Sequence, residues 1–500
     1  MKNKFIYLAV LSAVFAGCEP EFDNEVTNAS YSAGEADFSS YVAIGNSLTA
    51  GYIDGTVYKS GQQYSFPNIL SQQFALVGGG EFTQPSYEDD INNTGGFLLG
   101  GTQITSTRLV INTSTGGPEP IAGLPSADVT TLQAKAYNNM GVPGAKSFHF
   151  LAAGYGNLAG VQAGMANPYF VRTATSPTAT VLGDAMSKNP TFFTNWVGDM
   201  DVLAFATSGG TGKDQTGNMD PASYGPNDIT DPNVFASVYS TITNTLTASG
   251  AKGVCATIPN VTSIPYFTTV PYNPVPLDAG TAALLNQSFA QYNGGLQAAK
   301  NAGLITADEA SRRTIVFHEG VGNAVTISDE GLTNLATLGL PPYRQATASD
   351  LIVLTARSVI GTRVDGNPLQ INGVSVPLGD QWVLVPSEIE LINTATTNFN
   401  NTIKAIAASK GLAVADMNAV LTQLVTGLQS ADGQIYKAGY FSPATANTVV
   451  FSLDGVHPNA RGYAIVANEF IKVINSHYKA HLPFVIPGQY PGATVVTSNP

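Results

Sequence analysis

The sequence predicts an α/β fold built on a doubly wound parallel sheet. Short apolar runs that end at Gly or Pro alternate along the 500 residues with stretches that carry the apolar spacing of helices. The composition is that of a folded chain, because 44% of the residues are hydrophobic and only 11% are charged. The length allows up to three domains or one large domain with long insertions.

Four short apolar runs are expected to be buried strands. The first three each stop at a Gly or Pro, which ends a strand cleanly, and the fourth follows the end of a helix at Gly411. The expected strands are Tyr41–Ile44, Thr191–Val197, Gly253–Ile258 and Leu412–Ala415.

Helices are expected between and after these strands. The clearest spans 386–410, where Ser387 and Glu390 form a predicted capping box and Gly411 closes the helix. The other expected helices begin at Ser47 or cover Asn233–Ser249, Leu277–Ala302 and Asn459–His477. Alternation of strands and helices in this order favours a parallel sheet covered by helices.

Two long stretches, near 55–130 and 313–385, are expected to be insertions with partly β structure, because brief β-prone runs in them are separated by turn residues. The loop 209–231 is rich in Gly, Asp and Asn, but its acidic residues miss the spacing of a calcium loop. We therefore expect one domain over 40–482, followed by a Pro- and Gly-rich tail, 483–500, outside the core.

The N-terminus predicts export and lipidation. Lys2 and Lys4 precede an apolar run that ends at Gly17-Cys18, the order of a secretory signal peptide over residues 1–17. Phe15-Ala16-Gly17-Cys18 resembles the bacterial lipobox, which implies lipidation of Cys18 and an acidic tether over 18–39. The alternative is an ordinary secreted protein in which Cys18 has no role. The expected location is the outer membrane, through the lipid anchor, with exposure at the cell surface left open.

Charge and cysteine content exclude several classes of protein. The chain has 22 basic and 35 acidic side chains, a net charge of -13, and no basic cluster that would bind phosphates, so no nucleic-acid partner is expected. Its two cysteines, Cys18 and Cys255, cannot build a disulfide framework, and neither lies in a zinc-binding pattern. Cys255 is expected to be a buried apolar residue, and no metal or cofactor is predicted.

Four segments near the ends of expected strands carry the candidate chemistry. They are Gly45-Asn46-Ser47-Leu48-Thr49, Asn139-Met140-Gly141-Val142-Pro143-Gly144, Gly198-Asp199-Met200-Asp201 and Asp454-Gly455-Val456-His457-Pro458. In an open parallel sheet such segments converge beyond the carboxyl ends of the strands. A serine nucleophile needs a base, and the base needs an acceptor that fixes its tautomer. Ser47, His457 and Asp454 are predicted to fill these roles.

Taken together, the four segments resemble the SGNH, or GDSL-like, hydrolase superfamily. The resemblance implies a three-layer α/β/α sandwich with a central parallel, flavodoxin-like sheet and hydrolysis of acyl esters. It assigns oxyanion-binding N–H groups to Ser47 and Gly144. Met200 stands where the family has an oxyanion-binding Asn, and a thioether offers no N–H donor. Asn195 or a bound water is expected to substitute for it.

Each candidate has a structural alternative. Ser47 would otherwise be a helix N-cap, Asp454 a turn residue bound by backbone N–H groups, and His457 a solvated loop residue. His149, His318, His477 and His481 lack catalytic context and are expected to be structural. Trp196 and Phe205 are interpreted as core residues, with lining of an acyl pocket as the alternative.

The sequence therefore predicts a lipid-anchored serine ester hydrolase of the esterase or lipase type. The expected substrate is a lipid-like acyl ester or an acetylated glycan, with the membrane contacted through the anchor. The alternative is a catalytically weak or inactive accessory lipoprotein on the same fold, which binds an outer-membrane protein partner. A structural lipoprotein that binds glycan through its insertions is a third hypothesis, with no motif behind it.

Overall fold

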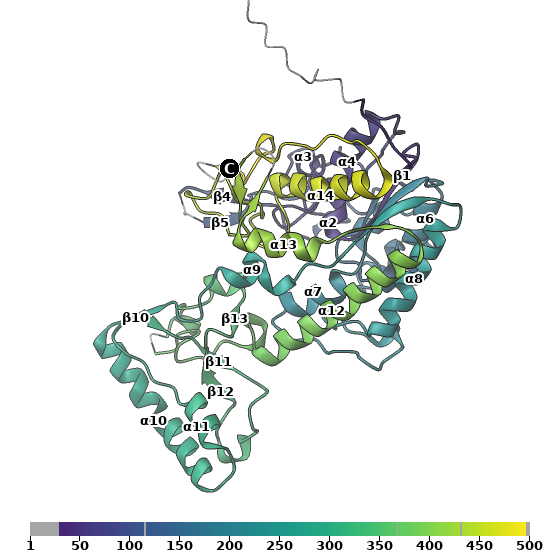
Figure 1. The fold of residues 1–500 in the computed structure, drawn as a ribbon. Coiled ribbons are helices and arrows are strands. Elements are labelled where there is room, and N and C mark those ends of the chain that lie inside the picture. The colour runs from purple at the N-terminus through teal and green to yellow at the C-terminus, as the bar shows by residue number, and fades with distance from the viewer. Residues whose placement is uncertain (1–29, 115–116, 368, 431–432, 497–500) are drawn as a thin grey trace, which may run out of the picture.

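The structure, a computed structural model, describes residues 30–114, 117–367, 369–430 and 433–496 (Figure 1). The expected signal peptide and Cys18 lie outside the described residues, as does most of the expected tether. No helix in these ranges is both long enough and apolar enough to cross a membrane.

The chain is a mixed α/β protein whose central sheet has five parallel strands flanked by helices (Figure 1), which confirms the fold class at this level. The strands are β1 (Tyr41–Gly45), β6 (Asn139–Gly141), β7 (Phe192–Trp196), β8 (Lys252–Ala256) and β15 (Ala413–Ala415). Their spatial order is β15-β8-β7-β1-β6. From β1 the chain adds β6 on one side and β7 on the other, so the direction of winding switches at β1. Ligands of open α/β sheets bind at such a switch point.

Register within the sheet aligns the ends of the three strands that carry candidate residues. Gly45 at the end of β1 pairs with Gly141 of β6 on one side and with Trp196 of β7 on the other. The loops that follow these strands therefore leave the sheet at the same level. Strand β6 has only three residues, too short for an apolar run in the sequence to reveal it.

The helices of the chain range from single turns to six turns. They are α2 (Ser47–Ala50), α3 (Lys59–Gln62), α4 (Phe66–Ala75), α5 (Pro168–Thr173), α6 (Val181–Met186), α7 (Met200–Thr207), α8 (Pro232–Thr247), α9 (Pro265–Thr268), α10 (Ala279–Asn301), α11 (Ala307–Arg313), α12 (Pro386–Ser409), α13 (Met417–Thr426) and α14 (Ala460–Tyr478). Helix α4 packs against α14, with the rings of Phe66 and Phe470 stacked 4.8 Å apart. Helices α8 and α12 also pack against each other.

Helix α12 begins where the sequence predicts but is capped by a different residue. Glu388, not Glu390, folds back so that its Oε2 accepts the backbone N–H of Val385 over 2.8 Å. The predicted Ser387–Glu390 capping box is therefore wrong. Pro386 occupies the first turn, where its missing N–H costs nothing, and this shifts the capping acid by two positions.

The stretch 55–130 contains core helix α4 as well as β structure. Its strands are β2 (Leu98–Leu99), β3 (Thr102–Gln103), β4 (Leu109–Asn112) and β5 (Gly117–Pro120). The tail contributes β18 (Val495–Val496), which pairs in parallel with β4. The tail is therefore not wholly outside the core, which corrects the prediction from the sequence, because Val485 and Tyr490 pack against the main core and β18 extends the small sheet of this region.

Residues 275–384 form a lobe that projects from the core (Figure 1). Its strands are β9 (Val275–Leu277), β10 (Gly320–Asn323), β11 (Thr326–Ser328), β12 (Tyr343–Gln345), β13 (Leu351–Ile352) and β14 (Val383–Leu384). Helices α10 and α11 belong to the same lobe and precede the stretch 313–385 in which the sequence predicts an insertion. The lobe has a small apolar core of its own, including Leu296 and Leu340.

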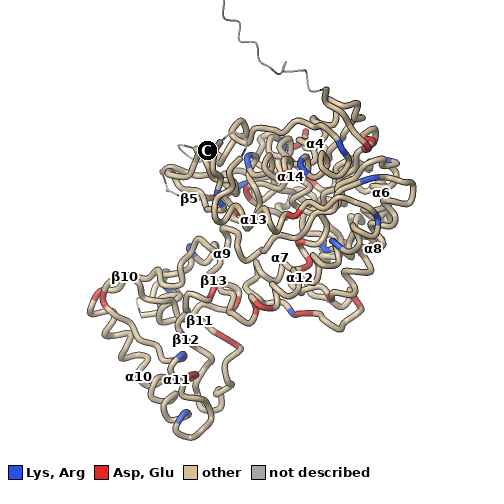
Figure 2. Tube along the Cα trace, viewed as in Figure 1, with Lys and Arg blue, Asp and Glu red and all other residues tan. Residues whose placement is uncertain are grey.

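Two further short strands, β16 (Leu428–Gln429) and β17 (Ile435–Tyr436), form a hairpin between α13 and α14. Acidic positions are spread over both the core and the lobe, with basic positions between them (Figure 2).

Candidate active site

The structure brings Ser47, His457 and Asp454 together in series. Nε2 of His457 lies 2.9 Å from Oγ of Ser47, and Nδ1 of the same ring lies 2.8 Å from Oδ2 of Asp454. Ser47 is the first residue of α2 and follows the end of β1. His457 lies 410 positions further along the chain, on the same loop as Asp454. These distances fit a nucleophile, a base and an acceptor that orients the base.

The structure contradicts the structural alternatives for Ser47 and His457, and agrees in part with the one for Asp454. Asn46, rather than Ser47, is the N-cap of α2, since its side chain accepts the N–H of Leu48. The His457 side chain is only 12% exposed, so it is not a solvated loop residue. Asp454 does bind backbone N–H groups, as a turn residue would, but it also binds the imidazole.

The Asp454 carboxylate is held by five donors. Oδ1 accepts the N–H groups of Val456 and His457 and the hydroxyl of Ser452, while Oδ2 accepts the His457 ring and the N–H of Gly55. Burial raises the pKa of this carboxyl, but the His457 ring and the backbone donors outweigh burial, and the net pKa is lowered. Asp454 is therefore an anion at neutral pH, as a partner for an imidazolium must be.

A turn that leads into the first insertion supports the loop that holds Asp454 and His457. Oδ1 of Asp54 accepts the N–H of Leu453 over 2.9 Å, and the Tyr52 ring lies against the His457 ring at 4.5 Å between centroids. Burial raises the pKa of Asp54 to about 7, and the nearby Asp454 charge adds to the shift. Sequence reasoning missed Asp54 and Tyr52, because nothing in their own segment links them to a loop 399 residues away.

Both predicted oxyanion donors are free. The backbone N–H groups of Ser47 and Gly144 make no hydrogen bond within the described part of the chain. Gly144 has a φ of +79°, a conformation that favours glycine. Its loop is fixed by Asn167, whose Nδ2 donates to the carbonyl of Pro143 over 2.8 Å.

Met200 is the first residue of α7. Together with Ser47 and Gly144 it lines a large cavity, which is described below. Its thioether cannot donate a hydrogen bond. Asn195, the residue expected to substitute for it, lies fully buried within β7 and lines neither cavity at Ser47. Asn195 is therefore not placed as an oxyanion donor.

The acidic residues on both sides of Met200 connect the strand-end loops. Asn46 donates through Nδ2 to Oδ2 of Asp199 over 3.2 Å, and Asp201 accepts both the N–H and the hydroxyl of Ser147 at 2.8 and 2.7 Å. All of these groups are buried, and burial raises the pKa of Asp199 to about 7. The loops after β1, β6 and β7 are thus held as one unit.

A cavity of about 860 Å³ opens above the Ser47 hydroxyl. This volume is within the usual range for sites that bind small molecules. Both insertions contribute to its wall, and Arg357 is the only Lys or Arg among the described residues that line it. The lining includes Tyr52, Leu109, Pro118, Tyr169, Tyr266, Leu354, Arg357 and Tyr440.

A second, smaller cavity of about 90 Å³ also contains Ser47 and His457 in its wall. Apart from these and Asp199, its lining is apolar, and much of it comes from α13: Met417, Val420, Leu421 and Leu424. Trp196 is buried in the core and also lines this cavity, whereas Phe205 does not. Ser47 and His457 therefore lie between a large cavity with a polar and apolar lining and a small cavity with a mostly apolar lining.

The other candidate residues have structural positions. His149, His318, His477 and His481 line neither cavity, and burial lowers the pKa of His149 to about 4. Cys255 is fully buried in β8, as the sequence predicts.

Comparison of the chain with models of protein families, with curated proteins and with solved structures finds no match.

Proposed function

We propose that the protein is a serine ester hydrolase of the SGNH type. The observation that carries the proposal is the chain of contacts from Ser47 Oγ through the His457 ring to Asp454, at 2.9 and 2.8 Å. Two observations support it: the strand order β15-β8-β7-β1-β6 with the site at the switch beside β1, and free N–H groups at Ser47 and Gly144. A three-layer α/β/α, flavodoxin-like sandwich is part of this proposal.

In the proposed reaction, Ser47 Oγ attacks the carbonyl carbon of the ester while His457 Nε2 takes the hydroxyl proton. The tetrahedral oxyanion accepts the N–H groups of Ser47 and Gly144. His457 then gives its proton to the leaving alcohol, and the acyl group remains on Ser47. Water, deprotonated by His457, releases the acid and restores the serine. Asp454 stabilises the imidazolium at each stage and no metal or cofactor takes part.

The two cavities suggest how an ester would be divided at Ser47. We assign the acyl chain to the small apolar cavity beside α13, because a chain of methylene groups gains free energy by leaving water for such a surface. The alcohol part is assigned to the large cavity, whose wall combines tyrosines with apolar residues and Arg357. This division suits a lipid-like ester, and a short acyl group such as the acetate of a glycan would also fit.

The membrane part of the proposal rests on Cys18. Acylation of this residue would anchor the protein to the outer membrane and place the site near lipid. Replacing Cys18 by Ser should move the protein from the membrane fraction to the soluble fraction. If the Cys18→Ser variant fractionates like the parent, the anchor is not a lipid on this cysteine.

A non-catalytic accessory protein, with an outer-membrane protein as partner, is the second candidate function. Met200 favours it, because loss of one oxyanion donor costs on the order of 10²–10³ in kcat. The intact geometry of Ser47, His457 and Asp454 favours the hydrolase.

The discriminating experiment is labelling with a fluorophosphonate, which modifies an activated serine. We expect the parent protein to be labelled at Ser47 and the Ser47→Ala and His457→Ala variants to remain unlabelled. The exposed His481 offers a matched control, since His481→Ala should label like the parent. Absence of labelling in the folded parent would favour the accessory protein.

A further inference from the structure

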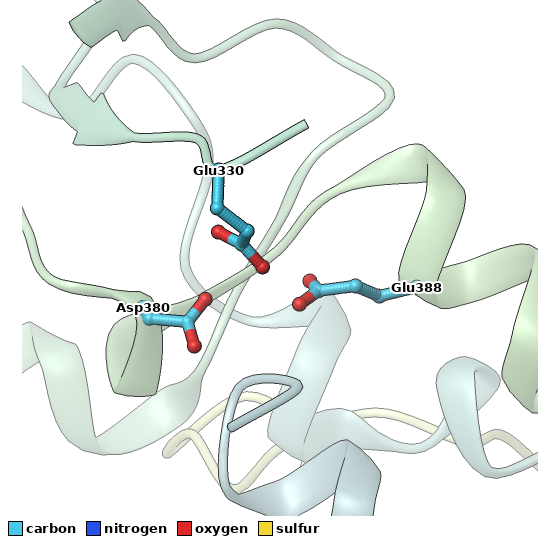
Figure 3. Close-up of side chains that lie close together, drawn as sticks. All are labelled: Glu330, Asp380 and Glu388. Atoms are coloured by element: carbon cyan, nitrogen blue, oxygen red, sulfur yellow. The ribbon is translucent and has the colours of Figure 1, made fainter. Parts of the chain in front are cut away.

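Three carboxylates meet where the lobe joins the core. Glu330 follows β11 and Asp380 precedes β14, both in the lobe, whereas Glu388 lies in the first turn of core helix α12. One oxygen atom from each lies within 4.8 Å of the others, and Figure 3 shows the three side chains pointing toward one another. It is the only group of this kind in the part of the chain that the structure describes.

The buried member of the group has an unsatisfied oxygen. Glu388 is only 5% exposed, and while its Oε2 caps α12 through the Val385 N–H, its Oε1 has no hydrogen-bond partner. This oxygen is on the side chain that faces Glu330 and Asp380 (Figure 3). A buried carboxylate oxygen without a partner is costly, so binding of a cation to this oxygen would be favourable.

The backbone leaves room for this oxygen. Gly210 has a φ of +83°, and a Cβ at this position would overlap Oε1 of Glu388. Glycine at position 210 therefore leaves space beside the Glu388 carboxylate, and any larger residue at this position would fill that space.

No basic side chain compensates the three charges. Among the described residues, no ion pair links Glu330, Asp380 or Glu388 to a Lys, Arg or His. The neighbouring Asp329 differs, since Arg344 binds it at 2.6 Å. Burial raises the pKa of Glu388 to about 8 and that of Asp380 to about 6, and the adjacent carboxylates add to both shifts.

We propose that Glu330, Asp380 and Glu388 bind one Ca²⁺ ion that fastens the lobe to helix α12. An all-oxygen set of carboxylates selects a hard cation. Ca²⁺ suits it better than Mg²⁺, because Ca²⁺ accepts irregular geometry and mixed ligands, whereas Mg²⁺ requires a near-ideal octahedron. The exposure of Glu330 leaves access for water to complete the coordination. None of the three residues lines the cavities at Ser47, so the proposed role is structural and independent of ester hydrolysis.

The structure supplies a spectroscopic probe, because Trp382 is two residues from Asp380 and the only other tryptophan is Trp196 in the core. Tb³⁺ bound at the three carboxylates should luminesce when tryptophan is excited, saturate at one ion per chain, and be displaced by Ca²⁺ at lower concentration than by Mg²⁺. The Trp382→Phe variant should lose most of this emission. Ca²⁺ should also raise the Tm of the purified, chelator-treated protein.

Variants at the three positions test the assignment. Glu388→Gln and Asp380→Asn should lose Tb³⁺ emission and the Ca²⁺-dependent rise in Tm. Glu330→Gln should weaken both, and its exposed position keeps folding unaffected. Glu319→Gln removes an exposed carboxylate elsewhere in the lobe and should behave like the parent.

The proposal is overturned if Ca²⁺ neither displaces Tb³⁺ nor raises the Tm of the parent, or if Glu330→Gln and Glu388→Gln respond as the parent does. A rise in Tm of the metal-free Glu388→Gln variant, with no Ca²⁺ response in the parent, would identify a proton-sharing group instead.

Discussion

The backbone N–H of Gly55 donates to Oδ2 of Asp454 over 3.1 Å, the same oxygen that faces the His457 ring. Gly55 belongs to the first insertion, so this insertion does more than shape the cavity. It holds the acidic member of the catalytic-type group in place, together with the Asp54–Leu453 contact beside it.

The Gly55→Ala variant tests this support. Gly55 has a φ of +88°, so alanine there strains the turn and displaces its N–H from Asp454. We expect kcat on a short-chain ester to fall about 5-fold, which corresponds to roughly 1 kcal/mol. Gly78→Ala is the control, since Gly78 has nearly the same φ, +87°, with open space around it and no contact to the site. Equal losses of kcat in both variants would contradict the supporting role.

Asp54 should make stability depend on pH. Its pKa of about 7 in the folded protein lies above the ordinary 3.8, so the folded state holds an extra proton between about pH 4 and pH 7. Stability from this group is therefore lost as the pH rises through that window. The Asp54→Asn variant keeps an oxygen for the Leu453 N–H and removes the titration.

We expect the free energy of unfolding of Asp54→Asn, relative to the parent, to increase by on the order of 3 kcal/mol between pH 4 and pH 8. Urea denaturation at the two pH values measures this difference. If the difference in free energy of unfolding between Asp54→Asn and the parent is the same at pH 4 and pH 8, the Asp54 carboxyl is not protonated in the folded protein.

The small apolar cavity should set the length of the acyl chain. Val420 of α13 lines it, so Val420→Phe should fill it and lower kcat/KM for an octanoyl ester by about 10-fold more than for an acetyl ester. Val425 lies on the same helix but is 51% exposed, and Val425→Phe should leave the ratio unchanged. A ratio that does not change in Val420→Phe would place the acyl chain in the large cavity.

The sequence predicts the strands that precede Ser47 and Met200, because each is a contiguous apolar run with a clear end. It also identifies Asp454 and His457, which lie within four residues of each other and so form a local motif. Strand β6 is missed because three residues carry no periodicity. Helix α4 is missed because its neighbours on both sides are rich in turn residues.

Contacts between distant segments have no signal in a single sequence. Asp54 reaches Leu453 across 399 positions, and Glu388 meets Glu330 and Asp380 only because the lobe folds back on α12. The Ser387–Glu390 capping box fails for a local reason: Pro386 already occupies the first turn of α12, so Glu388 rather than Glu390 caps the helix. Pattern alone does not show that the buried acid of this helix is Glu388.

Met200 is the residue on which the choice between an active and an inactive hydrolase depends, and one substitution at this position tests that choice. Met200 lines the cavity at the start of α7, while the N–H groups of Ser47 and Gly144 remain free for an oxyanion. Two backbone donors, a base and a nucleophile should give a slow but measurable esterase. Adding an amide with Met200→Asn should raise kcat by up to ~10²–10³, the contribution of one oxyanion donor. The measurement is kcat on the same ester for the parent, Met200→Asn and Ser47→Ala. Met200→Leu, which restores no donor, should match the parent. If the parent is no faster than Ser47→Ala and Met200→Asn gains nothing, the fold serves binding rather than catalysis.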